Sequence, residues 1–452
     1  MKQFAKKSLV LFIALFFTAA LSAKTPKYIF YCIGDGMSFA HVMATQLFYE
    51  NGNYEDGNES LVFLDFPVRS AIRTYANNSL ITCSAAAGTA LATGHKTNLA
   101  HIGIGPDKQP LTSVAKQLRD KGYAIGIITS GQLDDATPAA FYAGQMRNDT
   151  YQIGKEGADS QFDFLAGSTL MKPFNRRDPS QPYIYDYYRQ KGYTVCRGPE
   201  GYNSQKNADK ILLVDTDTTL KKWLPYVIER EPGKLGLEFM VQAGIEKLYK
   251  KKNKKGFFMM IEGASIDHAS HPRDIATTIY KKHPDETLII VTADHETGGL
   301  TIGETTTHPF NWEYVNYQKM SKESLSKLFQ KMRETGEIDT WEKTKKILAE
   351  NTGLWDKIPV NAGEEAQLMQ CYYETIVKKS SKQEITLYAK SEPLVADAIA
   401  LLNKKIGVGW TSFSHTGGFV PFYAIGCQAR QFGALNDNIE IPNTIRKIMK
   451  IK

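Results

Sequence analysis

Short apolar runs that end in acidic residues constrain the fold of this 452-residue chain more than any other feature. Residues 257–261 are bulky and apolar and read as a buried strand, and Glu262 follows directly. Asp267 and His271 come next, four residues apart, which places two side chains on one helical face. A carboxylate at a strand end with an Asp–His pair beyond it suits a cation site at the open end of a parallel sheet. A helix capped by Ser265 with solvated polar residues explains this stretch equally well, so other stretches must decide.

The same pattern recurs along the chain. Residues 28–33 form an apolar run that leads to Asp35, and residues 287–292 form another that leads to Asp294 and His295. Further apolar runs occupy residues 68–75, 123–129, 162–166, 211–214 and 420–425. Segments with helical periodicity occupy residues 38–49, 111–121, 138–146 and 393–405. This alternation predicts an α/β fold, a three-layer α/β/α sandwich with a large, mostly parallel central sheet.

The region 301–390 breaks this alternation. Its helical segments are polar and rich in lysine and glutamate, with few long apolar runs. We interpret it as a helical cap inserted beside the site. Residues 24–300 and 391–452 then form one α/β domain, which is long enough to bury a sizeable core.

The N-terminus has the features of an export signal. Three lysines within the first seven residues precede an apolar core at residues 9–18 and a small-residue cleavage site at residues 20–23. The apolar core is shorter than the roughly 18 residues of a membrane span. We therefore predict a cleaved signal peptide over residues 1–23, a periplasmic or secreted protein and no stable membrane insertion. An uncleaved anchor is the alternative.

Charge and cysteine usage exclude two further classes. The net charge of +7 falls to +4 once the three signal lysines are removed, and the remaining charges are interspersed apart from residues 250–255. No basic face interleaved with aromatic residues indicates nucleic-acid binding. The five cysteines are odd in number and lack CxxC spacing, so they read as buried thiols and not as a disulfide framework or zinc knuckle.

Ser84 is the candidate nucleophile. It opens a run of small residues, 84–94, in which a helix N-terminus would favour an anion. A serine hydroxyl needs a base or a metal to take its proton, and no GxSxG elbow indicates an acyl-transfer hydrolase. The alternative is that Ser84 is only a helix cap.

Ligands in open α/β sheets bind outside the carboxyl ends of the strands, where these acidic residues and His415 would converge. A set of histidine and aspartate suits zinc, and the oxygen-rich set of Asp35, Thr137 and Glu262 suits magnesium.

Together these segments resemble the alkaline phosphatase family. The matching segments are IGDGM (33–37), SAAAGTALATGHKT (84–97), DATPAA (135–140), IEGASID with a histidine four residues on (261–271), VTADHETGG (291–299) and SHTG (414–417). They occur in the family's order and span almost the whole mature chain. The set is specific, although each short segment alone is not.

The resemblance implies the family's fold and hydrolysis of phosphate monoesters through a phosphoserine on Ser84, with two zinc ions and one magnesium ion. It implies one zinc ion on Asp267, His271 and His415, a second on Asp35, Asp294 and His295, and magnesium on Asp35, Thr137 and Glu262. It also implies an arginine clamp for the phosphoryl oxygens, assigned to Arg147, and a homodimer.

Three positions depart from the family's pattern. Cys83 stands where many members carry an aspartate that orients the arginine, and the arginine register is shifted by about one residue, so Asn148 competes with Arg147. The crossover over residues 272–286 is short, and Pro272 disfavours helical geometry at His271. Two other readings follow: a phosphodiesterase or sulfatase-like enzyme on the same sheet, and a metal- or phosphate-binding protein with impaired turnover.

Overall fold

The computed structural model describes residues 24–51, 60–216, 223–251, 254–270, 286–303, 310–379, 384–385 and 390–451. Its main sheet has nine strands in the order β2-β17-β10-β1-β9-β4-β6-β8-β7. Their bounds are β1 (Tyr28–Gly34), β2 (Val68–Ile72), β4 (Ala124–Thr129), β6 (Phe164–Ala166), β7 (Tyr193–Arg197), β8 (Lys210–Val214), β9 (Phe257–Gly263), β10 (Thr287–Ala293) and β17 (Val420–Gly426). All neighbours pair in parallel except β17, which is antiparallel to both β10 and β2. The predicted mostly parallel sheet is confirmed.

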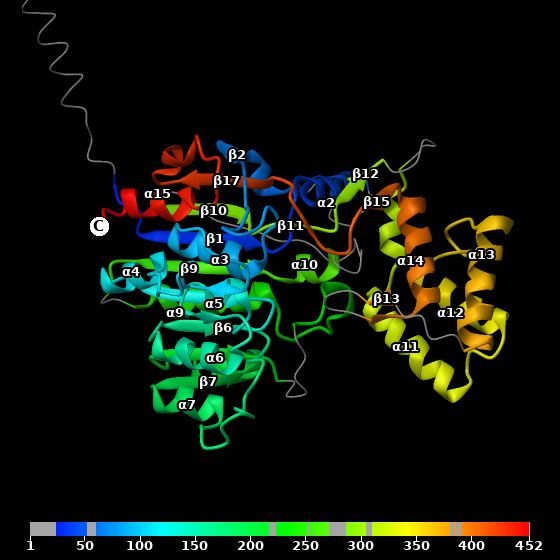
Figure 1. Cartoon of the computed structure of the whole chain (residues 1–452), viewed down its shortest axis with the longest axis horizontal. Helices are drawn as coiled ribbons and strands as arrows, with labels where there is room; N and C mark the ends of the chain where they lie inside the picture. The colour runs from blue at the N-terminus through cyan, green and yellow to red at the C-terminus, as the bar shows by residue number, and fades with distance from the viewer. Residues whose placement is uncertain are drawn as a thin grey trace, which may run out of the picture.

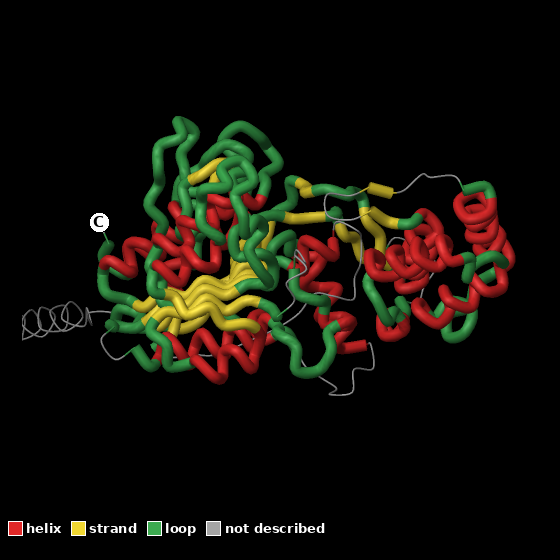
Figure 2. The backbone as a smooth tube through the Cα atoms, turned by 90° about the horizontal axis from the view of Figure 1, so that it is seen from below, coloured by secondary structure: helices red, strands yellow, loops and turns green. Residues whose placement is uncertain are grey.

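Helices cover both faces of this sheet (Figures 1 and 2). One face carries α3 (Ser84–Thr93), α4 (Val114–Asp120), α5 (Ala136–Ala139), α6 (Thr150–Asp159), α7 (Ile184–Gln190) and α15 (Glu440–Ile448). The other carries α8 (Gly198–Gln205) and α9 (Leu237–Tyr249). Within β1, Ile29 and Tyr31 enter the first core and Phe30 enters the second. Strands buried on both faces explain why the sequence shows continuous apolar runs and not alternation.

A helical lobe extends from one end of the sheet, at the right of Figure 1. Its helices are α11 (Lys322–Thr335), α12 (Trp341–Thr352), α13 (Ala362–Tyr372) and α14 (Pro393–Ile406). They share a hydrophobic cluster of their own, which includes Leu325, Phe329 and Leu402 and also takes in part of α2 (Phe39–Asn51). The strand pair β12 (Leu300–Ile302) and β15 (Val408–Trp410) connects the lobe to the sheet.

Shorter elements complete the description. They are β3 (His101–Ile102), β5 (Gln145–Met146), α10 (Ser265–Ser270), β11 (Glu296–Thr297), β13 (Glu384–Ile385), β14 (Lys390–Ser391), β16 (His415–Thr416), η1 (Val62–Asp65), η2 (Val227–Glu229), η3 (Trp312–Tyr317), η4 (Tyr373–Val377) and η5 (Ala429–Phe432). No helix among the described residues combines the length and apolarity needed to cross a bilayer. The predicted signal peptide lies outside the described residues.

The predicted helix over residues 138–146 is wrong. The helix there, α5, ends at Ala139, and the chain then turns so that β5 pairs antiparallel with β3. Gly144 lies in the turn, where its backbone N–H donates to Glu156 Oε2 at 2.7 Å. Apolar residues in this segment fit a helical pattern, but a long-range strand pair determines the local structure.

Candidate active site

Three neighbouring strands bring the acidic residues together. β1 lies between β9 and β10, parallel to both, with Gly34 level with Gly263 and Ala293. Asp35 and Asp294 follow the ends of β1 and β10, and all three strands end at one edge of the sheet. This edge is where open α/β sheets bind their ligands.

Asp35, Asp294 and His295 form one group that could hold a metal ion, with their ligand atoms within 4.8 Å of one another. His295 Nε2 lies 3.1 Å from Asp294 Oδ2 and 3.4 Å from Asp35 Oδ1. The other oxygen of Asp294, Oδ1, accepts hydrogen bonds from the backbone N–H groups of Gly36 (3.1 Å) and His295 (2.9 Å). One oxygen is thus fixed by the backbone while Oδ2 faces the group.

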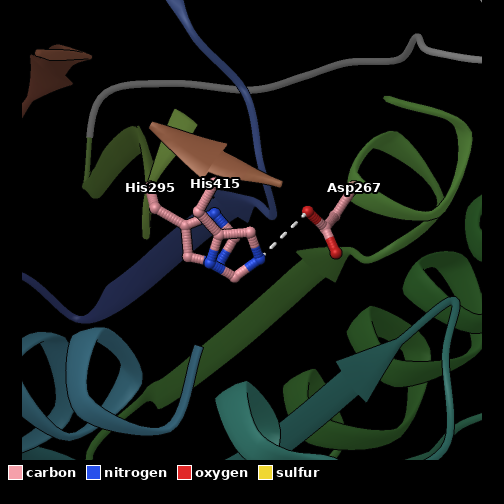
Figure 3. Close-up of side chains that lie close together, drawn as sticks. All are labelled: Asp267, His295 and His415. Carbon is pink, nitrogen blue, oxygen red and sulfur yellow. Dashed lines mark ion pairs between the residues drawn. The ribbon is translucent and has the colours of Figure 1, made fainter. Parts of the chain in front are cut away.

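A second group consists of Asp267, His295 and His415 (Figure 3). His415 Nε2 lies 3.7 Å from Asp267 Oδ1, and the rings of His295 and His415 stack with centroids 3.6 Å apart. The β11–β16 pair places His415 opposite Thr297, so a residue from the C-terminal part of the chain enters the site. His271, predicted as a ligand here, lies outside the described residues together with most of the short crossover.

Two of the predicted magnesium ligands, Thr137 and Glu262, lie beside these groups but in neither of them, whereas the third, Asp35, belongs to the first group. Glu262, near the end of β9, accepts a hydrogen bond from the Thr129 hydroxyl and lies beside the Asp35 carboxyl group. Thr137 Oγ1 donates to Asp294 Oδ2 at a long 3.5 Å. The structure therefore brings Asp35, Thr137 and Glu262 around the buried Asp294 carboxylate.

The charges of the site call for cations. Asp35, Asp267, Asp294 and Glu262 are all buried, at 5% exposure or less. Burial is the main cause that raises the pKa of Glu262 to about 8 and that of Asp294 to about 6, and neighbouring carboxylates contribute; the pKa of Asp35 is raised well above its usual value for the same reasons.

No described donor hydrogen-bonds to Asp35 Oδ1. Several buried carboxylates with imidazole neighbours are stable only with protons or cations among them, and this donor set fits zinc and magnesium.

Ser84 is the first residue of α3 and is 2% exposed. Its Oγ lies 3.2 Å from His295 Nε2, the nitrogen that faces Asp35 and Asp294. The preceding residue, Cys83, provides no side-chain cap to the helix. The hydroxyl and the first amides of α3 therefore lie beside the cluster, where the helix dipole favours an anion.

Thr297 fixes the proton positions of this network. Its hydroxyl donates to Asp267 Oδ1, so its oxygen accepts from His295 Nδ1, 3.2 Å away. His295 then carries its proton on Nδ1, and its Nε2 lone pair accepts from the Ser84 hydroxyl. That lone pair is also the one that a metal ion would use.

Arg147 follows β5, and its Nη2 lies 3.1 Å from Asp135 Oδ1. Its backbone N–H donates to Ala100 O at 2.8 Å, and the N–H of Ala100 donates to Cys83 Sγ at 3.4 Å. Arg147 is thereby linked through one residue to the start of α3. Asn148 is exposed. Asp135 also acts electrostatically on Glu262, so this ion pair borders the metal cluster.

Sequence reasoning missed Asp135 and Thr297 as participants. Both lie within quoted motifs, Asp135 opening DATPAA and Thr297 two residues after His295. Their positions beside assigned residues were a usable signal. Asp135 pairs with Arg147, 12 residues later, and Thr297 with Asp267, 30 residues earlier, and only the fold brings these partners together.

Comparisons with known proteins identify the family of this chain. The sequence matches the model of the family described as "Alkaline phosphatase" over residues 26–164 and 221–451. Alkaline phosphatase 4 of Bacillus subtilis is 29% identical over 442 residues, which cover 92% of this chain and 87% of that protein. Alkaline phosphatase 3 of the same organism is 26% identical, covering 100% of this chain and 98% of that protein.

Solved structures show the same fold. The cold-active alkaline phosphatase of Shewanella sp. is 25% identical and superposes with a TM-score of 0.73, covering 93% of this chain and 99% of its own. The alkaline phosphatase of Thermus thermophilus, 22% identical, superposes with a TM-score of 0.76 and covers 95% and 92% of the two chains. This chain belongs to the alkaline phosphatase family and is a phosphomonoester hydrolase.

Proposed function

We propose that this protein is an exported alkaline phosphatase that hydrolyses phosphate monoesters through a phosphoserine on Ser84, with two zinc ions and one magnesium ion. One observation carries the proposal: Ser84 Oγ, at the N-terminus of α3, lies 3.2 Å from the imidazole nitrogen of His295. His295 belongs to both candidate metal groups. His295 thus connects the nucleophile to both metal groups.

The residues divide among three metal positions. Asp267, His271 and His415 would hold the first zinc ion, Asp35, Asp294 and His295 the second, and Asp35, Thr137 and Glu262 the magnesium ion. When bound, these ions supply positive charge for the phosphoryl group and lower the pKa of hydroxyl groups and water beside them.

The chain's own residues carry the two displacement steps. Ser84 Oγ gives up its hydroxyl proton and forms a bond to phosphorus as the bond to the alcohol oxygen breaks, and the alcohol oxygen takes up one proton as it leaves. A water oxygen then gives up a proton and bonds to phosphorus, and Ser84 Oγ leaves and regains a proton, which gives inorganic phosphate and the free serine. The N-terminal amides of α3 face the charge that remains on the phosphoryl oxygens throughout.

Arg147 would bind two non-bridging oxygens as a fork. Its ion pair with Asp135 supports this role, because a carboxylate on one side of the guanidinium holds its plane in place. Asp135 would then orient the arginine in place of the aspartate that many family members carry at the position of Cys83. The exposure of Asn148 argues against that residue as the clamp.

The test is turnover of p-nitrophenyl phosphate at pH 9 by the purified mature protein, compared with bis-p-nitrophenyl phosphate and p-nitrophenyl sulfate. We expect the monoester to be the fastest substrate, and chelation and Ser84→Ala to reduce its turnover by about a thousandfold or more. Faster turnover of the diester or sulfate would favour the related hydrolases. Bound zinc without turnover would indicate a protein that binds but does not catalyse.

We further propose that residues 1–23 are an export signal, that residues 24–300 and 391–452 form the catalytic domain, that residues 301–390 form a cap, and that the protein is a homodimer. The separate hydrophobic cluster of the helical lobe supports the cap, and α14 packs into that cluster from the adjoining segment. An intact mass that matches a chain beginning at residue 24 would support export. A mass from light scattering of twice that of one chain would support dimerisation.

A further inference from the structure

His41 interacts electrostatically with Asp267 but belongs to none of the assigned sites. It is on α2, six residues after Asp35, and is 3% exposed. Its ring contacts Trp410, with ring centroids 5.8 Å apart, and its two nitrogens both have polar partners. A buried imidazole with two specific hydrogen bonds holds its neighbours in one arrangement.

The direction of each hydrogen bond follows from the geometry. His41 Nδ1 accepts from the backbone N–H of Ser38 at 3.1 Å, so this nitrogen carries no proton, and the Ser38 hydroxyl, 2.8 Å away, is then a second donor to it. The proton is therefore on Nε2, which lies 2.9 Å from Ser270 Oγ. The Ser270 hydroxyl donates its single proton to Ile266 O at 2.7 Å, so Ser270 Oγ accepts from His41.

This chain of hydrogen bonds joins the elements that carry the two metal groups. Ser38 lies three residues after Asp35, on the loop that follows β1. Ser270 is the last residue of α10, the helix that carries Asp267, and is 1% exposed. It immediately precedes His271 in the sequence.

We infer that His41 is a positioning residue that holds α10 in the orientation in which Asp267 can bind the first zinc ion. The inference rests on the metal assignment proposed above. α10 has six residues, too few to be stable by its backbone bonds alone. Its buried side chains and the bond between Ser265 and Ser130 hold its start, and His41 holds its last residue, Ser270. The loop after β1 is the fixed end of this chain of hydrogen bonds, because β1 is central in the sheet.

The test measures zinc release and not activity. Zinc-loaded wild type, His41→Phe, Ser270→Ala and the double variant are mixed with excess of a colorimetric zinc chelator, and the release rate of each ion is followed. Phenylalanine keeps a ring against Trp410 and removes the hydrogen bonds of both ring nitrogens. We expect His41→Phe to accelerate release of one zinc ion by about tenfold or more. The same ion should be the one that His415→Ala fails to retain.

Two comparisons make the result specific. The effects of His41→Phe and Ser270→Ala should not add in the double variant, because both remove the same contact. His41→Gln, which keeps a donor toward Ser270, should restore slow release in part. His101→Phe is the matched control: it removes another buried histidine, whose Nδ1 lies 3.0 Å from Gly105 O, and should leave zinc release unchanged.

Three outcomes overturn the inference: release from His41→Phe at the wild-type rate, equal acceleration of both ions, or fully additive effects in the double variant. Failure of the wild type to bind two zinc ions would instead contradict the proposed function. Circular dichroism of the chelated variants checks that His41→Phe is folded before zinc is added.

Discussion

At the scale of single residues, Thr297 connects the two candidate metal groups through one hydroxyl. It donates to Asp267 and accepts from His295, so it fixes one ligand in each group. Neither interaction requires the metal to be present. The site is therefore held partly in place by the residues around the ligands, an arrangement that raises metal affinity by reducing the cost of ordering them.

Thr297→Val keeps the shape of this side chain and removes the hydroxyl. We expect zinc affinity to fall about 10- to 100-fold, because Asp267 and His295 Nδ1 both lose a buried partner. Competition with a zinc-buffering chelator measures the affinity. Thr301→Val, at an exposed position on β12, is the control and should bind zinc as the wild type does. Unchanged affinity in Thr297→Val would show that the metal alone orders the ligands.

Asp134 gives a prediction about pH. It is buried, and burial is the main cause that raises its pKa to about 7, although the N–H of Met171 donates to both its oxygens. In the unfolded chain the pKa is about 3.9. The folded state therefore holds this proton up to about pH 7, and the stability that it contributes is present below pH 4 and is lost as pH rises toward 7.

Asp134→Asn removes this titration and keeps an acceptor for Met171. The melting temperature of the variant minus that of the wild type should rise from pH 4 to pH 7 and then level off. Thermal melts of the chelated proteins at each pH measure this difference. A difference that stays constant with pH would mean that Asp134 is charged in the folded protein at all these values.

At the scale of elements, the β3–β5 pair determines where Arg147 lies. Gly103 follows β3 with φ of 60°, and a Cβ there would lie 1.9 Å from Ala143 O, in the turn before β5. The two segments can approach this closely only because Gly103 has no side chain. Arg147 follows β5 directly and bonds to Ala100 before β3, so displacement of one strand displaces the arginine.

Gly103→Ala should lower the free energy of unfolding by about 2–4 kcal/mol, through backbone strain and a steric clash together. It should also raise KM for p-nitrophenyl phosphate more than it lowers kcat, because Arg147 moves relative to the substrate oxygens. Gly233→Ala is a matched control, with φ of 80° and no atom within 4 Å of the added Cβ. The control should lose about 1 kcal/mol and keep its KM. Equal effects would assign the loss to backbone strain alone.

The sequence was informative for elements whose burial leaves a pattern. Parallel strands covered on both faces appear as continuous apolar runs, so β1, β9 and β10 and the acidic residues after them could be predicted. β5 could not, because its two residues carry no periodicity and its partner lies more than 40 residues earlier. The same holds for Asp135, Thr297 and His41, because each has at least one partner 12 or more residues away and the local sequence is ordinary.

At the scale of the whole molecule, the cores on the sheet and the hydrophobic cluster of the helical lobe have different relations to the metals. The sheet core ends at the metal groups, whereas the helical lobe is built around its own cluster. An ion that binds only the folded site stabilises it by about 2.7 kcal/mol at one hundred times its Kd. Melting temperature should therefore rise with free zinc in a buffered series.

Phe329→Ala, in the hydrophobic cluster of the lobe, tests whether the stability of the lobe affects the metal site. Loss of this fully buried side chain should lower the local stability of the lobe by about 3–5 kcal/mol. Its zinc affinity and the kcat of the folded fraction should remain near the wild-type values. A large loss of zinc affinity would show that the lobe orders the metal site. Calorimetry with and without zinc, together with chelator competition, measures both quantities.

The most direct test of the account is to trap the covalent step on Ser84. The zinc-loaded protein is mixed with an excess of p-nitrophenyl phosphate, quenched in acid within milliseconds and digested, and the peptide that contains Ser84 is analysed by mass spectrometry. The account predicts phosphate on Ser84 in the wild type and none after chelation, with negligible turnover in Ser84→Ala. Turnover without phosphate on Ser84, together with wild-type turnover by Ser84→Ala, would contradict it.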